Sequence, residues 1–376
     1  MSRTIIDVHV IQTVPPSNIN RDDTGSPKTA VYGGVRRARV SSQAWKRSTR
    51  DAFDRLLDRE NLGVRTKQVV EMIGGVIAEQ EPDLAERAPE LATAVLEAAG
   101  FKLKAARKKD AQDESEFLLF LSHRQVRNLA ALAVEAARTA TGDKIAVDKG
   151  EAKARADRDH SVDVSLFGRM VANLPDLNVE AAVQVAHALS VHGVTNEYDY
   201  FTAVDDHKSA DDEEDSGAGM IGTVEFNSST LYRYAALDVD LLRGNLGDTD
   251  ATRRAVEAFA RAFVMSMPTG KQNTFANRTL PDAVLLVARE TQPINLVGAF
   301  EDAVGEGEKG GRIAASIRRL ADHARELHEA FDETPVRVWA FGGGERVEPL
   351  AELGERVTLD GAVAALGALV AERAPS

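Results

Sequence analysis

The spacing of apolar residues changes twice along this chain of 376 residues, and these changes restrict its possible folds. Apolar and polar side chains alternate over residues 4–13, which predicts a strand that ends at Pro15-Pro16. Residues 59–160 show mainly helical spacing, and alternation returns from Val183, where the alanine content leaves a helix as the close alternative. Further strands are predicted at 226–234, 284–288 and 336–341, and further helices at 249–267 and 312–331. We therefore expect an α+β fold with a large helical insertion.

A polar loop and a short basic strand separate the first strand from the first helix. The loop runs from Ser17 to about Gly34, and the strand that follows, Val35–Val40, carries Arg37 and Arg39 on one face. Ser41 and Ser42 are favourable residues for the start of a helix. The predicted helix has an apolar stripe of Trp45, Thr49, Ala52, Phe53 and Leu56.

Charge is distributed unevenly along the chain. The net charge is −13, yet the first fifty residues hold nine Lys or Arg against three Asp, and the rest therefore carries −19. Acidic residues are concentrated in the run 211–215. An acidic protein with one basic segment is typical of a single polyanion-binding face. The alternative is that these charges only solvate the surface.

Composition excludes several classes of protein. The chain has no cysteine, so it forms no disulfide, thiolate metal site or cysteine nucleophile. The first residues lack the pattern of a signal peptide, and no apolar run approaches the ~18 residues that suggest a membrane span. We expect a soluble cytoplasmic protein without a membrane partner.

Several motifs in order along residues 1–280 resemble the CasC family, the backbone subunit of the type I-E CRISPR Cascade complex. The N-terminal motifs are Asn20-Arg21-Asp22-Asp23, Gly33-Gly34, Arg36-Arg37-Ala38-Arg39-Val40-Ser41-Ser42-Gln43 and Lys46-Arg47. The later motifs are Gly168-Arg169-Met170, Ala186-His187-Ala188, Phe201-Thr202-Ala203-Val204-Asp205-Asp206, Glu225-Phe226, Tyr232-Arg233-Tyr234-Ala235 and Gly270-Lys271-Gln272. Each motif alone is weak, whereas the ordered set is specific.

The resemblance implies a palm built on a modified RNA-recognition-type (ferredoxin-like) sheet, a helical finger insertion and a long thumb loop. The expected boundaries are palm residues 1–58, 181–194 and 224–376, finger residues 59–180 and thumb residues 195–223. The helical spacing at 59–160 agrees with the position of the finger.

The resemblance also implies a set of residues that bind guide RNA. These are Asn20, Arg21, Lys28, Ser42, Gln43, Lys46, Arg50, Arg169, Met170, Phe201, Thr202, Lys271 and Gln272. An RNA backbone presents one phosphate per nucleotide, which repeated cations and the N–H groups of a helix start can bind. Lys46 and Arg50 lie four residues apart, on one helix face. The alternative is a solvated basic helix with ordinary capping.

Three of these residues have specific roles in the family. Met170 is expected to act as a wedge beside a displaced nucleotide, although a single methionine more often fills a core. Phe201 and Thr202, at the base of the thumb, are expected to contact RNA held by a neighbouring copy. Phe201 alternatively packs the loop onto the sheet.

A second basic cluster lies in the expected finger. Its members are Lys102, Lys104, Arg107, Lys108 and Lys109. These residues are expected to meet target DNA, and the alternative is a solvated helix face.

The sequence shows no convincing catalytic site. Asp22 and Asp23 are the one candidate Mg²⁺ site, but adjacent Asp residues in a turn more often cap it. His187 and His192 point to opposite faces of their predicted strand, so they form no metal pair. A P-loop and a nucleophile elbow are also missing. We expect no enzyme activity, no metal and no cofactor.

The resulting hypothesis is a noncatalytic subunit that stacks head to tail along a CRISPR guide RNA. Its expected partners are the guide, target DNA through the guide, further copies of itself, other Cascade subunits and a separate nuclease-helicase. Two alternatives remain open, namely a metal-dependent ribonuclease using Asp22 or Asp23, and a monomeric nonspecific RNA-binding protein.

Overall fold

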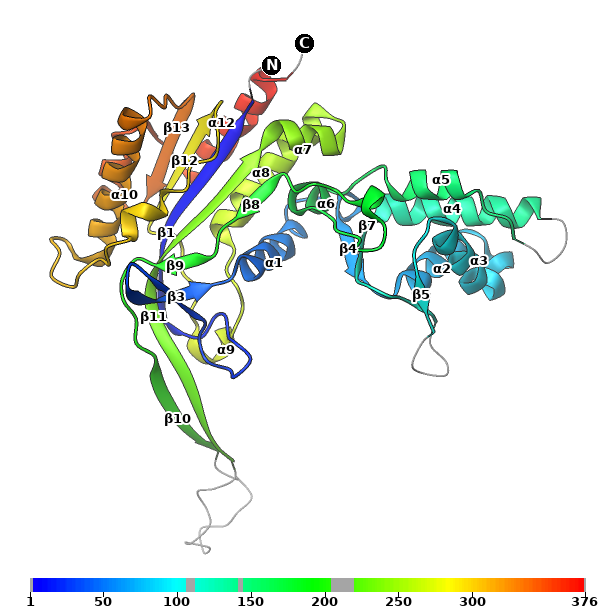
Figure 1. Cartoon of the computed structure of the whole chain (residues 1–376), viewed down its shortest axis with the longest axis horizontal. Helices are drawn as coiled ribbons and strands as arrows, with labels where there is room; N and C mark the ends of the chain where they lie inside the picture. Colours follow the sequence, from blue (N-terminus) through cyan, green and yellow to red (C-terminus); the bar gives the residue numbers. More distant parts are fainter. Residues whose placement is uncertain (1–2, 106–111, 141–144, 204–219, 375–376) are drawn as a thin grey trace, which may run out of the picture. The chain divides into compact units, whose positions relative to one another are not determined.

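The structure is a computed structural model that describes residues 3–105, 112–140, 145–203 and 220–374. The chain forms two compact units. The first unit contains Met1–Asp51, Val185–Ala236 and Phe259–Leu366, and the second contains Ala52–Gln184, Leu237–Ala258 and Gly367–Ser376. Both are shown in Figure 1.

A ten-stranded sheet holds the first unit together. Its order is β14-β13-β12-β1-β11-β9-β3-β2, and β8 and β10 also pair with β11. The strands are β1 (Ile5–Ser17), β2 (Thr29–Tyr32), β3 (Val35–Val40), β8 (Val183–Val185), β9 (Ala188–Ser190), β10 (Glu197–Ala203), β11 (Met220–Asp238), β12 (Ala283–Arg289), β13 (Arg337–Gly342) and β14 (Glu355–Arg356). The β1–β12 and β12–β13 pairs are antiparallel, whereas β13 and β14 are parallel, so the sheet is mixed.

Helices cover both faces of this sheet. They include α1 (Ser42–Phe53), α8 (Thr249–Met265), α10 (Gly311–Ala330), α11 (Glu348–Ala351) and α12 (Leu359–Glu372). The short helix α9 (Gln272–Phe275) has no buried residue. On one face, α10 shares an apolar core with β11 and β12, which includes Leu320 and Tyr232 (Figure 1). Arg233 points to the opposite face, where its guanidinium lies against Trp45 of α1 and Phe263 of α8. The predicted α+β class is confirmed.

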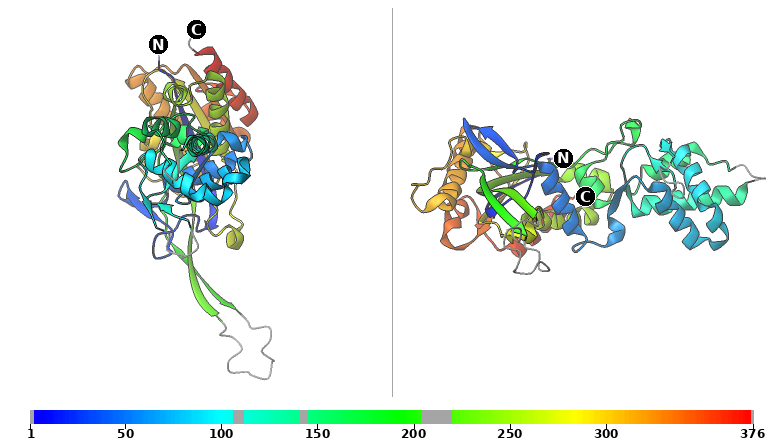
Figure 2. Two further views of the ribbon diagram at one scale, coloured as in Figure 1. Left: turned by 90° about the vertical axis from the view of Figure 1, so that its right-hand side faces the viewer. Right: turned by 90° about the horizontal axis from the view of Figure 1, so that it is seen from below.

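An antiparallel hairpin extends from the sheet. β10 pairs with the first part of β11, from Glu197 opposite Phe226 to Ala203 opposite Met220. Figures 1 and 2 show this hairpin projecting away from the other strands of the unit. The prediction of a loop over 195–223 is therefore wrong for residues 197–203 and 220–223, because these are paired strands. Residues 204–219, with Asp205, Asp206 and the acidic run, lie outside the described residues.

Three predicted features of the sheet need correction. β1 continues through Pro15-Pro16 to Ser17, because proline is compatible with extended backbone and lacks only the N–H donor. The expected loop contains β2, which pairs with β3 across Gly33-Gly34; both glycines have positive φ, 57° and 73°, as a tight hairpin turn requires. The single strand expected from Val183 is divided into β8 and β9.

The second unit is mainly helical. Its helices are α2 (Val69–Gln80), α3 (Ala88–Ala98), α4 (His123–Thr139), α5 (Lys149–Ala156), α6 (Val162–Phe167) and α7 (Val239–Leu246). It also has the strand pairs β4 (Gly63–Thr66) with β7 (Leu119–Ser122) and β5 (Leu103–Lys104) with β6 (Glu114–Ser115). Ser122 caps the helix that follows it: its Oγ accepts from the Gln125 N–H.

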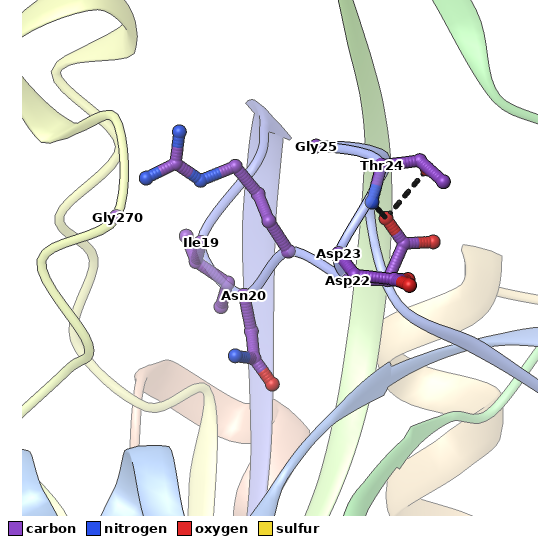
Figure 3. A pocket seen from close by; sticks show the side chains of 8 residues that line it. Ile19, Asn20, Asp22, Asp23, Thr24, Gly25 and Gly270 are labelled. Carbon is purple, nitrogen blue, oxygen red and sulfur yellow. Dashed lines mark hydrogen bonds between the residues drawn. The ribbon is translucent and has the colours of Figure 1, made fainter.

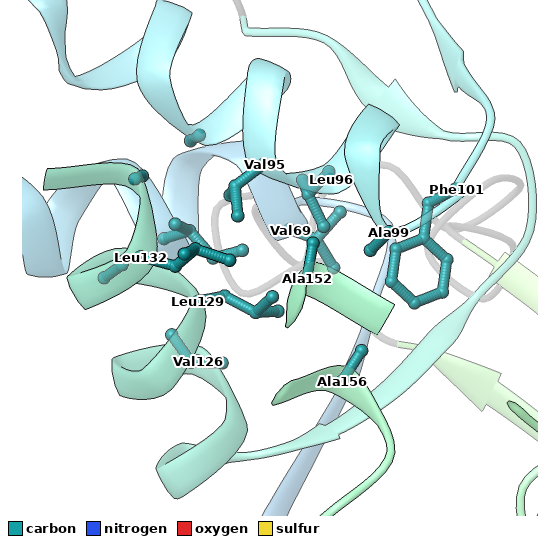
Figure 4. Close-up of a cluster of buried hydrophobic side chains, with 14 of the residues drawn as sticks. Val69, Val95, Leu96, Ala99, Phe101, Val126, Leu129, Leu132, Ala152 and Ala156 are labelled. Carbon is teal, nitrogen blue, oxygen red and sulfur yellow. The ribbon is translucent and has the colours of Figure 1, made fainter. Parts of the chain in front are cut away.

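The core of the second unit is formed by α2, α3, α4 and α5. Leu129 of α4, Val95 of α3 and Ile73 of α2 are fully buried in one cluster (Figure 4). Ala152 and Ala156 of α5 belong to the same cluster. These two small alanines therefore anchor α5 in the core, although most of its other residues are charged.

Candidate nucleic-acid interface

The loop that precedes β2 is held in a defined shape by its own polar groups. The Lys28 N–H donates to the Asn20 carbonyl at 2.9 Å, and Arg21 bridges to Pro27. Asn18 is buried, and its side-chain amide donates to the carbonyls of Gly25 and Glu225. The loop is therefore tied to β11 while Arg21 is left exposed.

This loop is also bonded to the start of α1. The Ser41 N–H donates to the Asn20 side-chain oxygen at 2.8 Å, and the Ser41 hydroxyl accepts from the Ala44 N–H at 3.3 Å. Ser42 is half-buried and Gln43 is exposed. The first turn of α1 contains no acidic residue. We call residues 20–28 together with Ser42–Arg50 the cradle.

The cations of the cradle differ in their environment. Arg21 and Lys28 form no ion pair among the described residues. Lys46 is half-buried, and burial lowers the pKa of its ammonium. Arg50 is half-buried one turn further along the same helix face. The predicted cradle residues are thus brought together in one part of the first unit.

Gly270 brings the segment before α9 against the cradle. A Cβ at Gly270 would lie 2.4 Å from the Ile19 carbonyl oxygen, so only glycine allows this approach. Together with Ile19 and residues 20–25 it lines an open pocket of about 520 Å³ (Figure 3).

Lys271 and Gln272 follow at the edge of this pocket. Lys271 has a left-handed backbone, with φ at 50°, and Gln272 is exposed. The Phe275 ring of α9 contacts Phe226 of β11, with centroids 5.7 Å apart. The predicted contacts Lys271 and Gln272 therefore lie between the cradle and the base of the β10–β11 hairpin.

Asp22 has a structural function in the turn. Its Oδ1 accepts hydrogen bonds from the Thr24 N–H at 2.9 Å, the Thr24 hydroxyl at 2.7 Å and the Ser26 N–H at 3.0 Å. The Thr24 hydroxyl is the main cause of the lowered pKa of Asp22. Across the described residues, no three His, Cys, Asp or Glu side chains are grouped as a metal site requires.

Arg37 and Arg39 differ although they lie on the same strand face. Arg37 is fully buried, and its guanidinium donates to the carbonyls of Tyr32, Ser190, Phe300 and Glu301. Arg39 is half-buried, and its Nη1 lies 3.0 Å from His187 Nδ1. The contact between Arg39 and His187 could not be found from the sequence, because 148 residues separate them.

The hairpin combines one packed and two exposed aromatic rings. Phe201 lies over Gly222, where a Cβ would be 2.4 Å from the ring, and it remains 39% exposed. Tyr198 and Tyr200 are exposed, and neither is among the predicted RNA contacts. Thr202 lies on β10 opposite Ile221. Phe201 therefore packs across the hairpin and still presents part of its ring.

Met170 and Arg169 have opposite environments in the second unit. Met170 is 82% exposed. Arg169 is buried, and it donates to the Leu177 and Ala156 carbonyls and to the Asp157 carboxylate at 2.8–3.1 Å. The structure gives Arg169 a packing role, because its Nε, Nη1 and Nη2 each donate within the second unit; its RNA contact stays a prediction. Arg169 thus anchors the segment that presents Met170.

The described part of the second basic cluster is close to acidic residues. Lys102 and Lys104 are exposed, near and on β5 and not on the predicted helix. Lys104 forms an ion pair with Glu116 at 2.9 Å. Arg107, Lys108 and Lys109 lie outside the described residues.

Solved structures of other proteins resemble this chain in both sequence and fold. A chain of a solved structure described as "CRISPR RNA-guided surveillance complex, pre-nicking" is 38% identical, with a TM-score of 0.84, over 98% of this chain and 99% of that one. A chain of a second "CRISPR RNA-guided surveillance complex" is 33% identical, with a TM-score of 0.74 and the same coverage. No curated protein matches the sequence. The chain is thus similar, over nearly its whole length, to proteins of CRISPR surveillance complexes.

The family follows from a second comparison. The family model described as "CT1975-like protein" matches residues 6–365. The chain belongs to this CT1975-like family. In the described parts of the chain, no helix is both long and apolar enough to cross a membrane.

Proposed function

We propose that the chain is a noncatalytic backbone subunit, of the CasC kind, of a type I-E Cascade complex, and that it binds the CRISPR guide RNA along its spacer. The cradle carries this proposal. Arg21 and Lys28 form no ion pair among the described residues, and they lie beside a helix start that has free N–H groups and no acidic first turn. Similarity to chains of RNA-guided surveillance complexes supports the same function.

In this proposal the fold divides into palm, finger and thumb. The sheet is a modified RNA-recognition-type palm (1–58, 181–194 and 224–376), residues 59–180 are the finger, and residues 195–223, whose described parts include β10 and the start of β11, are the thumb. The cradle binds ribose and phosphate, while the bases stay free to pair with target DNA. The protein recognises backbone and shape, and base pairing recognises sequence.

Several copies stack head to tail on one guide, which produces an open filament, because a heterologous interface need not close. The projecting hairpin brings Phe201 and Thr202 to RNA that a neighbouring copy holds. Met170 inserts beside a displaced nucleotide, and Lys102 and Lys104 meet target DNA. Other Cascade subunits complete the complex in the cytoplasm, and a separate nuclease-helicase cuts the DNA.

Asp22 supports the noncatalytic part of the proposal. Three donors occupy one of its carboxylate oxygens, and they hold the carboxylate in the turn. Incubation of the assembled complex with complementary RNA and Mg²⁺ tests this part: the RNA stays intact. Cuts at regular intervals that Asp22→Ala abolishes would instead establish the ribonuclease alternative.

Guide binding by the cradle is tested with the charge-reversal variant Lys46→Glu. The affinity for a CRISPR guide is measured from low to high KCl, and the salt slope falls by about 0.7 for each lost single-strand phosphate contact. Arg337→Glu is the matched control, because Arg337 is an exposed arginine on β13, outside the cradle. An unchanged slope for Lys46→Glu removes this residue from the interface.

Stacking is tested separately by light scattering on guides of increasing length. The mass of the complex increases in steps with spacer length. A constant mass of one protein per guide would favour the monomeric nonspecific RNA-binding alternative.

A further inference from the structure

Three basic side chains from separate segments of the first unit meet beside the cradle. Lys28 ends the cradle loop, Arg39 lies on β3, and His187 directly precedes β9. The Arg39 N–H donates to the Lys28 carbonyl at 2.9 Å, and the Arg39 Nε donates to the Thr29 carbonyl at 3.1 Å. Strand pairing brings His187 to the same place, because Val40 lies opposite Ala188. The group is therefore positioned by backbone contacts.

The contact between Arg39 and His187 fixes the tautomer of the imidazole. A guanidinium has only donors, so His187 Nδ1 accepts from Arg39 Nη1 across 3.0 Å. The proton of a neutral His187 then resides on Nε2. Burial, Arg39 and Lys28 all lower the pKa of His187, which keeps it neutral at pH 7. An exposed histidine thus offers one N–H donor beside two permanent positive charges.

These two positive charges lack a counter-charge in the described parts of the chain. Neither Lys28 nor Arg39 forms an ion pair there, and the charged groups that act on His187 are these two cations. Holding like charges close together costs free energy that an anion would recover. The arrangement therefore fits a bound anion with several acceptor oxygens.

The group is continuous with the cradle. The Asn20 carbonyl accepts from the Lys28 N–H, and the Asn20 side chain accepts from the Ser41 N–H at the start of α1. A strand of RNA on the cradle would reach the group without leaving the first unit.

We propose that Arg39 and His187, together with Lys28, form an additional phosphate site for the RNA backbone, next to the helix start. Arg39 and Lys28 supply the charge, and the Nε2–H of His187 donates to a phosphate or ribose oxygen. This inference rests on the proposed function, because the phosphate belongs to the guide.

The test compares variants that separate charge from hydrogen bonding. Arg39→Gln removes the charge, and it lowers guide affinity and reduces the salt slope by about 0.7. Arg39→Lys keeps the charge, so the salt slope is preserved. The affinity falls, because lysine lacks the planar, forked N–H donors of the guanidinium. His187→Gln retains a terminal N–H and binds like wild type, whereas His187→Leu weakens binding several-fold with an unchanged slope.

The controls keep this test separate from that of the proposed function. Wild-type binding of the guide and the effect of Lys46→Glu report on the function, whereas the Arg39 and His187 variants report on the additional site. If Arg39→Gln folds and retains the wild-type slope, or if His187→Gln and His187→Leu bind equally, the additional site is wrong and the function stands. If Arg39→Gln does not fold, the His187 pair decides.

Discussion

The guanidinium of Arg233 lies over the indole ring of Trp45, with its central carbon 3.8 Å from the ring centroid. The same carbon lies 4.7 Å from the centroid of the Phe263 ring. The Arg233 Nη1 donates to the Gln12 side chain at 2.6 Å. Burial lowers the pKa of this arginine to about 9, and the two aromatic faces offset part of the cost of its charge. This stack connects the sheet to α1 and so positions the cradle.

Replacing Arg233 therefore destabilises the fold. Arg233→Ala leaves a cavity and removes the donor to the Gln12 Oε1, and we expect the free energy of unfolding to fall by about 3–5 kcal/mol. Urea unfolding followed by tryptophan fluorescence measures it. Arg47→Ala, an exposed change on the same helix, should stay within about 0.5 kcal/mol. Equal stability of the two variants would show that the stack does not hold α1.

His9 makes the stability depend on pH. It is fully buried, its Nδ1 contacts the Tyr232 hydroxyl at 2.9 Å, and burial, then Arg289 and His328, lower its pKa to about 3. Below about pH 6.5 the unfolded chain binds one more proton at His9 than the folded chain does. The contribution of His9 is thus fully present above pH 6.5 and is lost as the pH falls toward 3, by about 1.4 kcal/mol per unit.

The variant His9→Gln removes the imidazole that takes up this proton. Unfolding free energies of wild type and variant, compared at pH 6.5 and pH 5, should show a weaker pH dependence in the variant. Comparison at pH 8 gives the pH-independent cost of the substitution. Parallel pH profiles would show that His9 binds its proton equally well in the folded and the unfolded chain.

The sequence predicted the strands and helices where the spacing of apolar residues was regular. β12, β13, α8 and α10 lie within a few residues of their predicted positions. β1 was harder to delimit, because it lies between neighbouring strands and is buried on both faces, so polar Asp7 and His9 are as buried as Val8. Alternation then carries no information about where the strand ends.

The candidate site was predicted only in part, for a similar reason. Local motifs located the cradle, because its loop and helix are contiguous in sequence. Whether an arginine is exposed depends on distant acceptors: Arg37 is buried by carbonyls up to 264 residues away, and Arg39, two positions later, reaches His187. Arg169 is buried by nearby carbonyls that no pattern of residue types reveals.

Gly270 sets how closely the segment before α9 approaches the cradle. In Gly270→Ala the new Cβ would lie 2.4 Å from the Ile19 carbonyl, which is part of the backbone and cannot rotate away. We expect a stability loss of about 1–3 kcal/mol and weaker guide binding, because the pocket edge shifts. Gly343→Ala is the matched control, since no atom lies within 4 Å of its Cβ position. If both variants bind the guide equally, the contact does not shape the interface.

Substitution of Met170 can test its contact with RNA without changing the stability of the fold. Its side chain is 82% exposed, so Met170→Ala should change the free energy of unfolding by less than about 0.5 kcal/mol. If Met170 acts as a wedge, chemical probing of the bound guide should lose the periodic reactivity of displaced nucleotides, while overall binding persists. Met170→Leu, which keeps apolar bulk, should retain that periodicity. Arg169→Ala should instead unfold at lower urea concentration, because it leaves the Leu177 carbonyl without this donor and removes one of the two donors to the Ala156 carbonyl. Unaltered reactivity in Met170→Ala would mean that the exposed methionine contacts something other than the guide.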